Sequence, residues 1–234
     1  MVRPRTVVDL CMLQINSKRV KSVGIHSDVS DVSIVSGFSE AADTLAIERA
    51  YRFPLQSGAP VLCTQGHRGH FTHFNPCTRH AIDLQCPVGT PVVALGNGRV
   101  VEVADGNTVS GIDVRNLYSW NSLMLELDDG MYVEYVHIKP ASAVVKKGER
   151  VAAGQVICSS GDIGFCPAPH LHIQMHRSPE KNAVTIPFAF LDRHGSPYVP
   201  SAGNYYEEAG PVVVVVSETA SSSPSDGVIN LSAE

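Results

Sequence analysis

Short apolar segments separated by turn residues fill the middle of this 234-residue chain. Residues 87–94 (PVGTPVVA) have the pattern of a turn that leads into a strand, and residues 96–98 (GNG) mark a turn before the alternating segment 99–103. Residues 123–127 and 132–137 flank an Asp-Asp-Gly turn, which is typical of a β-hairpin. The middle of the chain is therefore predicted to be all-β.

The two ends of the chain have different patterns. Residues 40–50 (EAADTLAIERA) follow Ser39, a suitable N-cap, and are predicted to form a helix. Residues 212–216 are five consecutive valines and are predicted to add an edge strand. The serine-rich residues 217–234 have the composition of a disordered tail.

These patterns predict three parts. Residues 1–50 form an N-terminal extension of mixed α/β character, residues 51–200 form a β domain, and residues 201–234 form a C-terminal strand with a disordered tail. The polar segment 105–120 is predicted to be a loop of the β domain. For residues 1–50 three interpretations are open: a propeptide-like cover, a partner-binding segment, or additional β structure.

Composition excludes some classes of protein. Apolar residues make up 44% of the chain and charged residues 18%, as expected of a globular protein with a buried core. The formal net charge of −5 argues against a nucleic-acid partner. No apolar window reaches the roughly 20 residues needed to span a bilayer. Asp9 interrupts the apolar residues near the N-terminus, so no convincing signal peptide is predicted.

Six cysteines leave the cellular compartment undecided. None of them forms a Cys-x-x-Cys pair, so a structural zinc ribbon is not expected. Disulfides between Cys77 and Cys86, or between Cys158 and Cys166, are left open.

The segment that carries the most chemical information is Pro169-His170-Leu171-His172, which enters an apolar run. Histidines two residues apart on a strand point to the same face, so one could bind a metal while the other performs acid–base chemistry. A catalytic metal site needs further ligands. Asp83 lies in the apolar segment 80–84, where a carboxylate is costly to bury unless it is paired or bound to a metal.

Several motifs together resemble the lysostaphin/LytM-type zinc metalloendopeptidases. They occur in the order of that family between about residues 51 and 177, with a motif core over 66–177. The matching segments are 69–73 (GHFTH), 79–84 (RHAIDL), 87–94, Asn121, 129–130, 135–137 (YVH), 151–155 (VAAGQ), 161–164 (GDIG) and 169–172 (PHLH).

The resemblance implies a fold, a metal and a reaction. The expected fold is an antiparallel, sandwich-like β core of the duplicated-hybrid-motif type with a narrow groove. One Zn²⁺ per domain would be held by His73, Asp83 and His172, with His137 and His170 as unliganded catalytic histidines beside it. The expected substrate is a peptide, in particular a peptidoglycan cross-link, and the expected location is secreted or in the cell envelope. The oligomeric state is left open.

Two departures from the family pattern bear on the site. Arg79 occupies the position where many members have the first ligand, and Arg79 cannot bind a metal. A longer-loop variant of the family has its histidine in a Gly-x-Phe-Ser/Thr-His segment, which favours His73, with His80 and His70 as alternatives. Leu127 replaces a histidine that is not a ligand.

The remaining candidates are given structural interpretations. His67 and His70 are expected in a solvated loop, His80 in a structural role, and His176 at the rim of the site. A thiolate ligand from Cys77 or Cys86 is disfavoured, and His26 and His194 lie outside the motif region.

Two other functions remain open. The same scaffold is compatible with a non-catalytic binding or regulatory module, for which the complete set of histidines would be unnecessary. A histidine phosphocarrier is a further alternative, although it would need no aspartate ligand.

Overall fold

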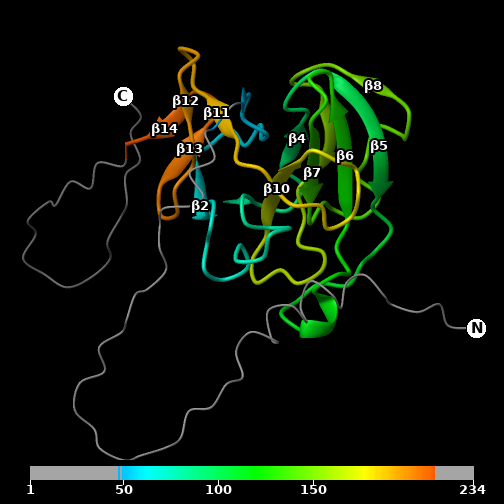
Figure 1. Ribbon diagram of the computed structural model, residues 1–234. Coiled ribbons are helices and arrows are strands. Elements are labelled where there is room, and N and C mark those ends of the chain that lie inside the picture. Colours follow the sequence, from blue (N-terminus) through cyan, green and yellow to red (C-terminus); the bar gives the residue numbers. More distant parts are fainter. Residues whose placement is uncertain (1–46, 48, 214–234) are drawn as a thin grey trace, which may run out of the picture. The chain divides into compact units, whose positions relative to one another are not determined.

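The computed structural model describes residue 47 and residues 49–213 (Figure 1). The regular secondary structure of this part of the chain is strand, apart from one short 3-10 turn, which confirms the all-β prediction. The first seven strands are β1 (Ala50–Tyr51), β2 (Val61–Gln65), β3 (Ile82–Gln85), β4 (Pro91–Val93), β5 (Gly98–Ala104), β6 (Ser122–Leu127) and β7 (Tyr132–Val136). The next seven are β8 (Arg150–Val151), β9 (Val156–Ser159), β10 (His170–His176), β11 (Ala189–Leu191), β12 (Pro197–Tyr198), β13 (Tyr205–Glu207) and β14 (Gly210–Val212).

Nine of these strands form one antiparallel sheet. Their order is β14-β13-β2-β3-β10-β7-β6-β5-β8, so β10 lies in the middle between β3 and β7. The strand β10 therefore connects the half of the sheet that holds β2 and the C-terminal strands to the half that holds β5–β8 (Figure 1). The long central strand is the element on which residues from distant parts of the sequence can meet.

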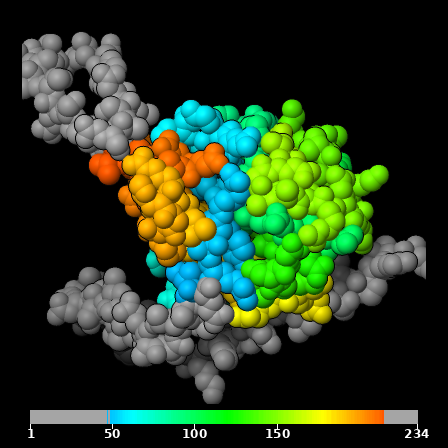
Figure 2. Space-filling view, turned by 90° about the horizontal axis from the view of Figure 1, so that it is seen from above, coloured from blue at the N-terminus to red at the C-terminus, as the bar shows by residue number. Residues whose placement is uncertain are grey.

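Two smaller sheets accompany the large one. In the first, β1 pairs in parallel with β11, which pairs antiparallel with β12. In the space-filling view, the blue residues at the start of the described segment lie between the orange C-terminal strands and the green middle of the chain (Figure 2). In the second small sheet, β4 pairs antiparallel with β9.

Alternation along β10 divides its side chains between two environments. Leu171, Ile173 and Met175 belong to the hydrophobic core, together with Tyr135 of β7 and Leu84 of β3. The hydroxyl oxygen of Tyr135 is buried and accepts a hydrogen bond from the backbone nitrogen of Leu95 at 2.9 Å. The polar residues of β10 consequently share the opposite face, which is also buried.

Several local predictions are confirmed and one is wrong. The hairpin forms as β6 and β7. The 105–120 loop contains a short 3-10 turn, η2 (Val114–Asn116), and isolated β-bridges from Ser110 to Ile163 and Gly164. Ala50, predicted to end a helix, instead lies in β1, because its backbone pairs with Ala189 of β11. The rest of that predicted helix lies outside the described residues, apart from Ile47 and Arg49, which are not helical.

The C-terminal strand is placed differently from the predicted valine run. β14 covers Gly210–Val212 and pairs with β13, which in turn pairs with β2. Residues 214–234, including most of the valine run and the predicted tail, lie outside the described residues, as do most of residues 1–50. The domain boundaries at 50 and 200 remain predictions. Among the described residues, none forms a helix with the length and apolar character needed to cross a membrane.

Gly161 should be intolerant of any side chain. A Cβ at this position would lie 2.6 Å from the His137 carbonyl oxygen and 2.6 Å from the Lys139 nitrogen, both of them backbone atoms that cannot move aside cheaply. We expect Gly161→Ala to lower the free energy of unfolding by about 1–3 kcal/mol, as measured by urea denaturation. Gly106→Ala is the control, because a Cβ there meets no atom within 4 Å. Equal stabilities of the two variants would contradict the observed packing.

Candidate metal centre

The pairing of β3 with β10 places a carboxylate directly beside a histidine. In the antiparallel register, Asp83 lies opposite His172, and Gln65 of β2 lies opposite Asp83 on its other side. Directly opposed residues project from the same face of a sheet. Three consecutive strands thus direct polar side chains to one place, on the face that is turned away from the hydrophobic core.

His73 reaches the same place from the loop between β2 and β3. Its Nδ1 lies 2.9 Å from the Gly66 carbonyl oxygen, to which it donates, so Nε2 is the nitrogen left for the site. Gln65 secures this loop: its Oε1 accepts hydrogen bonds from the backbone nitrogens of residues 71 and 72, at 3.2 and 3.0 Å. The Nε2 of Gln65 donates to Asp83 Oδ2 at 2.7 Å. One glutamine side chain therefore ties the loop to the aspartate.

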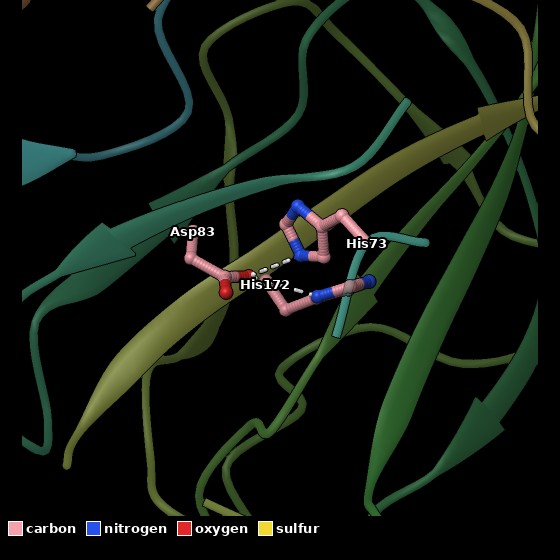
Figure 3. A group of neighbouring side chains, drawn as sticks. All are labelled: His73, Asp83 and His172. Carbon is pink, nitrogen blue, oxygen red and sulfur yellow. Dashed lines mark hydrogen bonds and ion pairs between the residues drawn. The ribbon is translucent and has the colours of Figure 1, made fainter. Parts of the chain in front are cut away.

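His73, Asp83 and His172 converge as the donor set of a metal centre (Figure 3). One potential ligand atom from each lies within 4.8 Å of the others, and all three residues are buried. Asp83 Oδ1 lies 3.2 Å from His73 Nε2 and 2.8 Å from His172 Nδ1. Within the described part of the chain, His73 Nε2 is buried and lacks a hydrogen bond. An unsatisfied buried nitrogen is costly, and a bound cation would remove that cost.

Both ligand histidines have the hydrogen bonds that metal binding requires on the far side of the ring. His73 donates from Nδ1, while His172 Nε2 lies 3.0 Å from Gln174 Oε1, an atom that can only accept. Two imidazole nitrogens and one carboxylate oxygen are ligands that suit zinc and leave a fourth position open. The residues present therefore fit a zinc ion.

His137 and His170 stand beside this group without belonging to it. Their ring centroids are 4.7 Å apart, and the ring of His137 is 6.0 Å from that of His172. The Nδ1 of His137 donates to the Ile163 carbonyl oxygen at 2.6 Å, and the Nδ1 of His170 donates to the Ala168 carbonyl oxygen at 2.8 Å. Each ring keeps Nε2 available. His170 Nε2 lies 3.7 Å from Asp83 Oδ1.

The backbone at His137 has an unusual conformation that bears on its placement. His137 directly follows β7, and strand alternation would turn its side chain away from the face that carries His172. Its φ of 63° lies in the left-handed region, which non-glycine residues rarely adopt. This turn ends the strand and brings the imidazole next to His170. Strained residues of this kind are concentrated at functional sites.

Electrostatics keep the aspartate charged and His137 neutral. Burial alone would raise the pKa of Asp83, but the neighbouring His170 and His172 outweigh it and hold that pKa well below its usual range. Burial, together with the electrostatic influence of the neighbouring His170 and His172, lowers the pKa of His137 to about 3. At neutral pH the site therefore offers an anionic ligand and an uncharged imidazole.

The other histidines divide into exposed and structural residues. His70 is exposed, as expected. His80 is buried and its Nδ1 lies 2.9 Å from the Thr185 carbonyl oxygen, which supports a structural role. The expectation for His67 is wrong, because its ring packs against His80 and Phe188 and burial lowers its pKa to about 3. His176 is also not a rim residue: it is buried, with Nε2 3.8 Å from Glu134 Oε2.

Among the residues that the structure describes, no cysteine belongs to the donor set of His73, Asp83 and His172. Cys86 is buried, and burial raises the pKa of its thiol, which opposes formation of a thiolate ligand. No disulfide links the five cysteines of the described segment.

Sequence reasoning missed the residues that support the ligands. Gln174 lies on the same face of β10 as the two histidines, so period-two spacing was a signal that could have identified it. Glu134 of β7 lies opposite Gln174 of β10, but this can be recognised only once the register of the two strands is known. Gln65 follows a β-bulge in β2, and no sequence signal pointed to it.

Comparison with known proteins shows which family the middle of the chain is similar to. Residues 78–185 match Peptidase family M23; His73 lies just before the matched range. The glycyl-glycine endopeptidase ALE-1 of Staphylococcus capitis is 36% identical over 124 residues, which cover 52% of this chain and 31% of that protein. The peptidoglycan DD-endopeptidase ShyB of Vibrio cholerae is 28% identical over 141 residues, which cover 56% and 28%.

A solved structure is also similar. The catalytic domain of the antimicrobial peptidase lysostaphin from Staphylococcus simulans aligns at 27% identity with a TM-score of 0.41, over 55% of this chain and 87% of that domain. The alignments span less than a third of the length of the two full-length relatives above. The sequence match includes Asp83, His137, His170 and His172. The part of this chain over residues 78–185 is therefore similar to peptidase family M23.

Proposed function

We propose that this protein is a zinc-dependent metalloendopeptidase that hydrolyses the peptide cross-links of peptidoglycan. The observation that carries the proposal is the convergence of His73, Asp83 and His172 on one point, with His137 and His170 beside it. The names of the relatives, a glycyl-glycine endopeptidase and a peptidoglycan DD-endopeptidase, support the substrate class. Such a substrate implies that the protein acts in the cell envelope or outside the cell.

The three convergent residues would hold the metal. His73 through Nε2, Asp83 through Oδ1 and His172 through Nδ1 are the atoms that face one another. Zinc bound to them would act as a Lewis acid on the scissile carbonyl group and would lower the pKa of a water molecule at its open position.

His137 and His170 would perform the proton transfers. A neutral imidazole can accept a proton from the attacking water and later return it to the leaving amine. The second imidazole, as an N–H donor, can stabilise the negative charge that develops on the carbonyl oxygen. The backbone carbonyls of Ile163 and Ala168 fix the orientation of the two rings, so little reorganisation is needed during the reaction.

The proposal predicts that the two histidines of β10 can be separated experimentally. His172→Ala removes a ligand, so the purified protein should lose most of its zinc and its peptidase activity. His170→Ala should retain zinc at close to one equivalent and lose at least about 100-fold in turnover, because only a proton-transfer group is lost. Metal content by mass spectrometry and digestion of purified peptidoglycan are the measurements.

His194→Ala is a suitable control, because His194 is exposed and lies outside the family match. A His170→Ala variant with undiminished turnover would rule out the catalytic role and favour a non-catalytic binding module. A wild-type protein that neither contains nor takes up zinc would rule out the metallopeptidase altogether.

Gln65 provides a second prediction. Gln65→Ala removes the bonds that hold the His73 loop and the Asp83 carboxylate together, so we expect zinc affinity to fall by about 10- to 100-fold. Affinity is measured by competition with a chromogenic chelator. Gln155→Ala is the matched control, since this half-buried glutamine also bonds to a backbone nitrogen, that of Ala152, in a different turn. An unchanged zinc affinity in a folded Gln65→Ala variant would contradict the assigned role.

A further inference from the structure

The polar face of β10 continues beyond the metal centre. His170, His172, Gln174 and His176 project from the same face, and all of them are buried. Only the first two belong to the proposed catalytic group. The buried glutamine finds a hydrogen-bond partner on the neighbouring strand β7, whereas the Nδ1 of His176 lies 3.1 Å from the Ala183 carbonyl oxygen.

A continuous chain of contacts leads away from His172. The ring nitrogen Nε2 of His172 lies 3.0 Å from Gln174 Oε1, and Gln174 Nε2 donates to Glu134 Oε2 at 2.8 Å. Gln174 and Glu134 are directly opposed in the register of β10 and β7. On the other side of the carboxylate, His176 Nε2 lies 3.8 Å from Glu134 Oε2. These contacts therefore run from a metal ligand to a half-buried acid.

The chemistry of these groups gives the chain a direction. A carboxylate only accepts hydrogen bonds, so Glu134 requires Gln174 to present its amide nitrogen. The amide oxygen must then face His172, and an oxygen in that position requires a proton on His172 Nε2. The lone pair on Nδ1 is then the one available to a metal ion. Without the metal, the 2.8 Å contact of Nδ1 with Asp83 Oδ1 is a hydrogen bond that needs a proton on Nδ1 as well. The reversed amide would place two oxygens, those of Gln174 and Glu134, against each other.

We propose that Gln174 and Glu134 are positioning residues that fix the tautomer of His172, so that Nδ1 is the atom presented to the metal. This inference rests on the proposed function, because it assigns His172 as a ligand. It goes further in identifying how the ligand atom is selected. Outer hydrogen-bond partners of this kind typically change metal affinity by about 10- to 100-fold when they are removed.

Three variants test the direction of the chain. Gln174→Leu removes the acceptor and should weaken zinc binding by about 10- to 100-fold. Glu134→Gln should also weaken it, because an amide at position 134 can donate and so permits the reversed orientation of Gln174. The double variant Gln174→Glu with Glu134→Gln should restore affinity to within about threefold of the wild type, because Glu at position 174 accepts from both neighbours.

Glu126→Gln is the matched control on the adjacent strand β6, where the carboxylate accepts a hydrogen bond from Tyr132. Zinc affinity is measured by competition with a chromogenic chelator, and the fold of each variant is checked by thermal unfolding. The proton on His172 Nε2 is observed in long-range ¹H–¹⁵N NMR spectra of the zinc-bound protein. A slowly exchanging Nε2–H in the wild type that exchanges faster with solvent in Gln174→Leu supports the proposal.

The outcomes separate this proposal from the proposed function. If the wild type binds zinc but a folded Gln174→Leu variant binds it equally well, or if the double variant stays as weak as Glu134→Gln, the positioning role is overturned. If the wild type takes up no zinc, the proposed function fails. In that case the positioning role fails as well, because there is no metal to which Nδ1 is presented.

Discussion

The site depends on a single buried carboxylate held in register. Asp83 is nearly inaccessible to solvent, and it remains charged there because His170 and His172 lie beside it, while Gln65 on β2 donates a hydrogen bond to its Oδ2. A slip of one residue between β3 and β10 would turn Asp83 into the hydrophobic core and Ile82 into the site. The apolar residues that alternate with Asp83 and His172 fix that register. The packing of the core therefore also determines the geometry of the site.

Much of the fold was predictable because its strands alternate clearly. The hairpin of β6 and β7 and the strand β10 follow from period-two patterns and turn residues. The failure at Ala50 has a physical reason: a two-residue strand has no periodicity to detect, and its conformation depends on pairing with β11, which is remote in sequence. Long-range pairing likewise decides that the C-terminal residues join the sheet through β2.

The site was predictable in part. Spacing placed His170 and His172 on one face, and the cost of burying Asp83 marked it as paired. His73 and His137 came from family resemblance, because alternation cannot place a loop histidine or one that follows a left-handed turn. The burial of His67 and His176 was misjudged for a similar reason: what covers a polar residue depends on loops and strands far away in the chain.

The central claim is that His73, Asp83 and His172 bind one metal ion. The most direct measurement is anomalous X-ray diffraction at the zinc absorption edge from crystals of the protein prepared with stoichiometric zinc. The account predicts one strong anomalous peak, bounded by His73 Nε2, Asp83 Oδ1 and His172 Nδ1. A peak coordinated instead by His80 or Cys86, or no ordered zinc at this position, would contradict it.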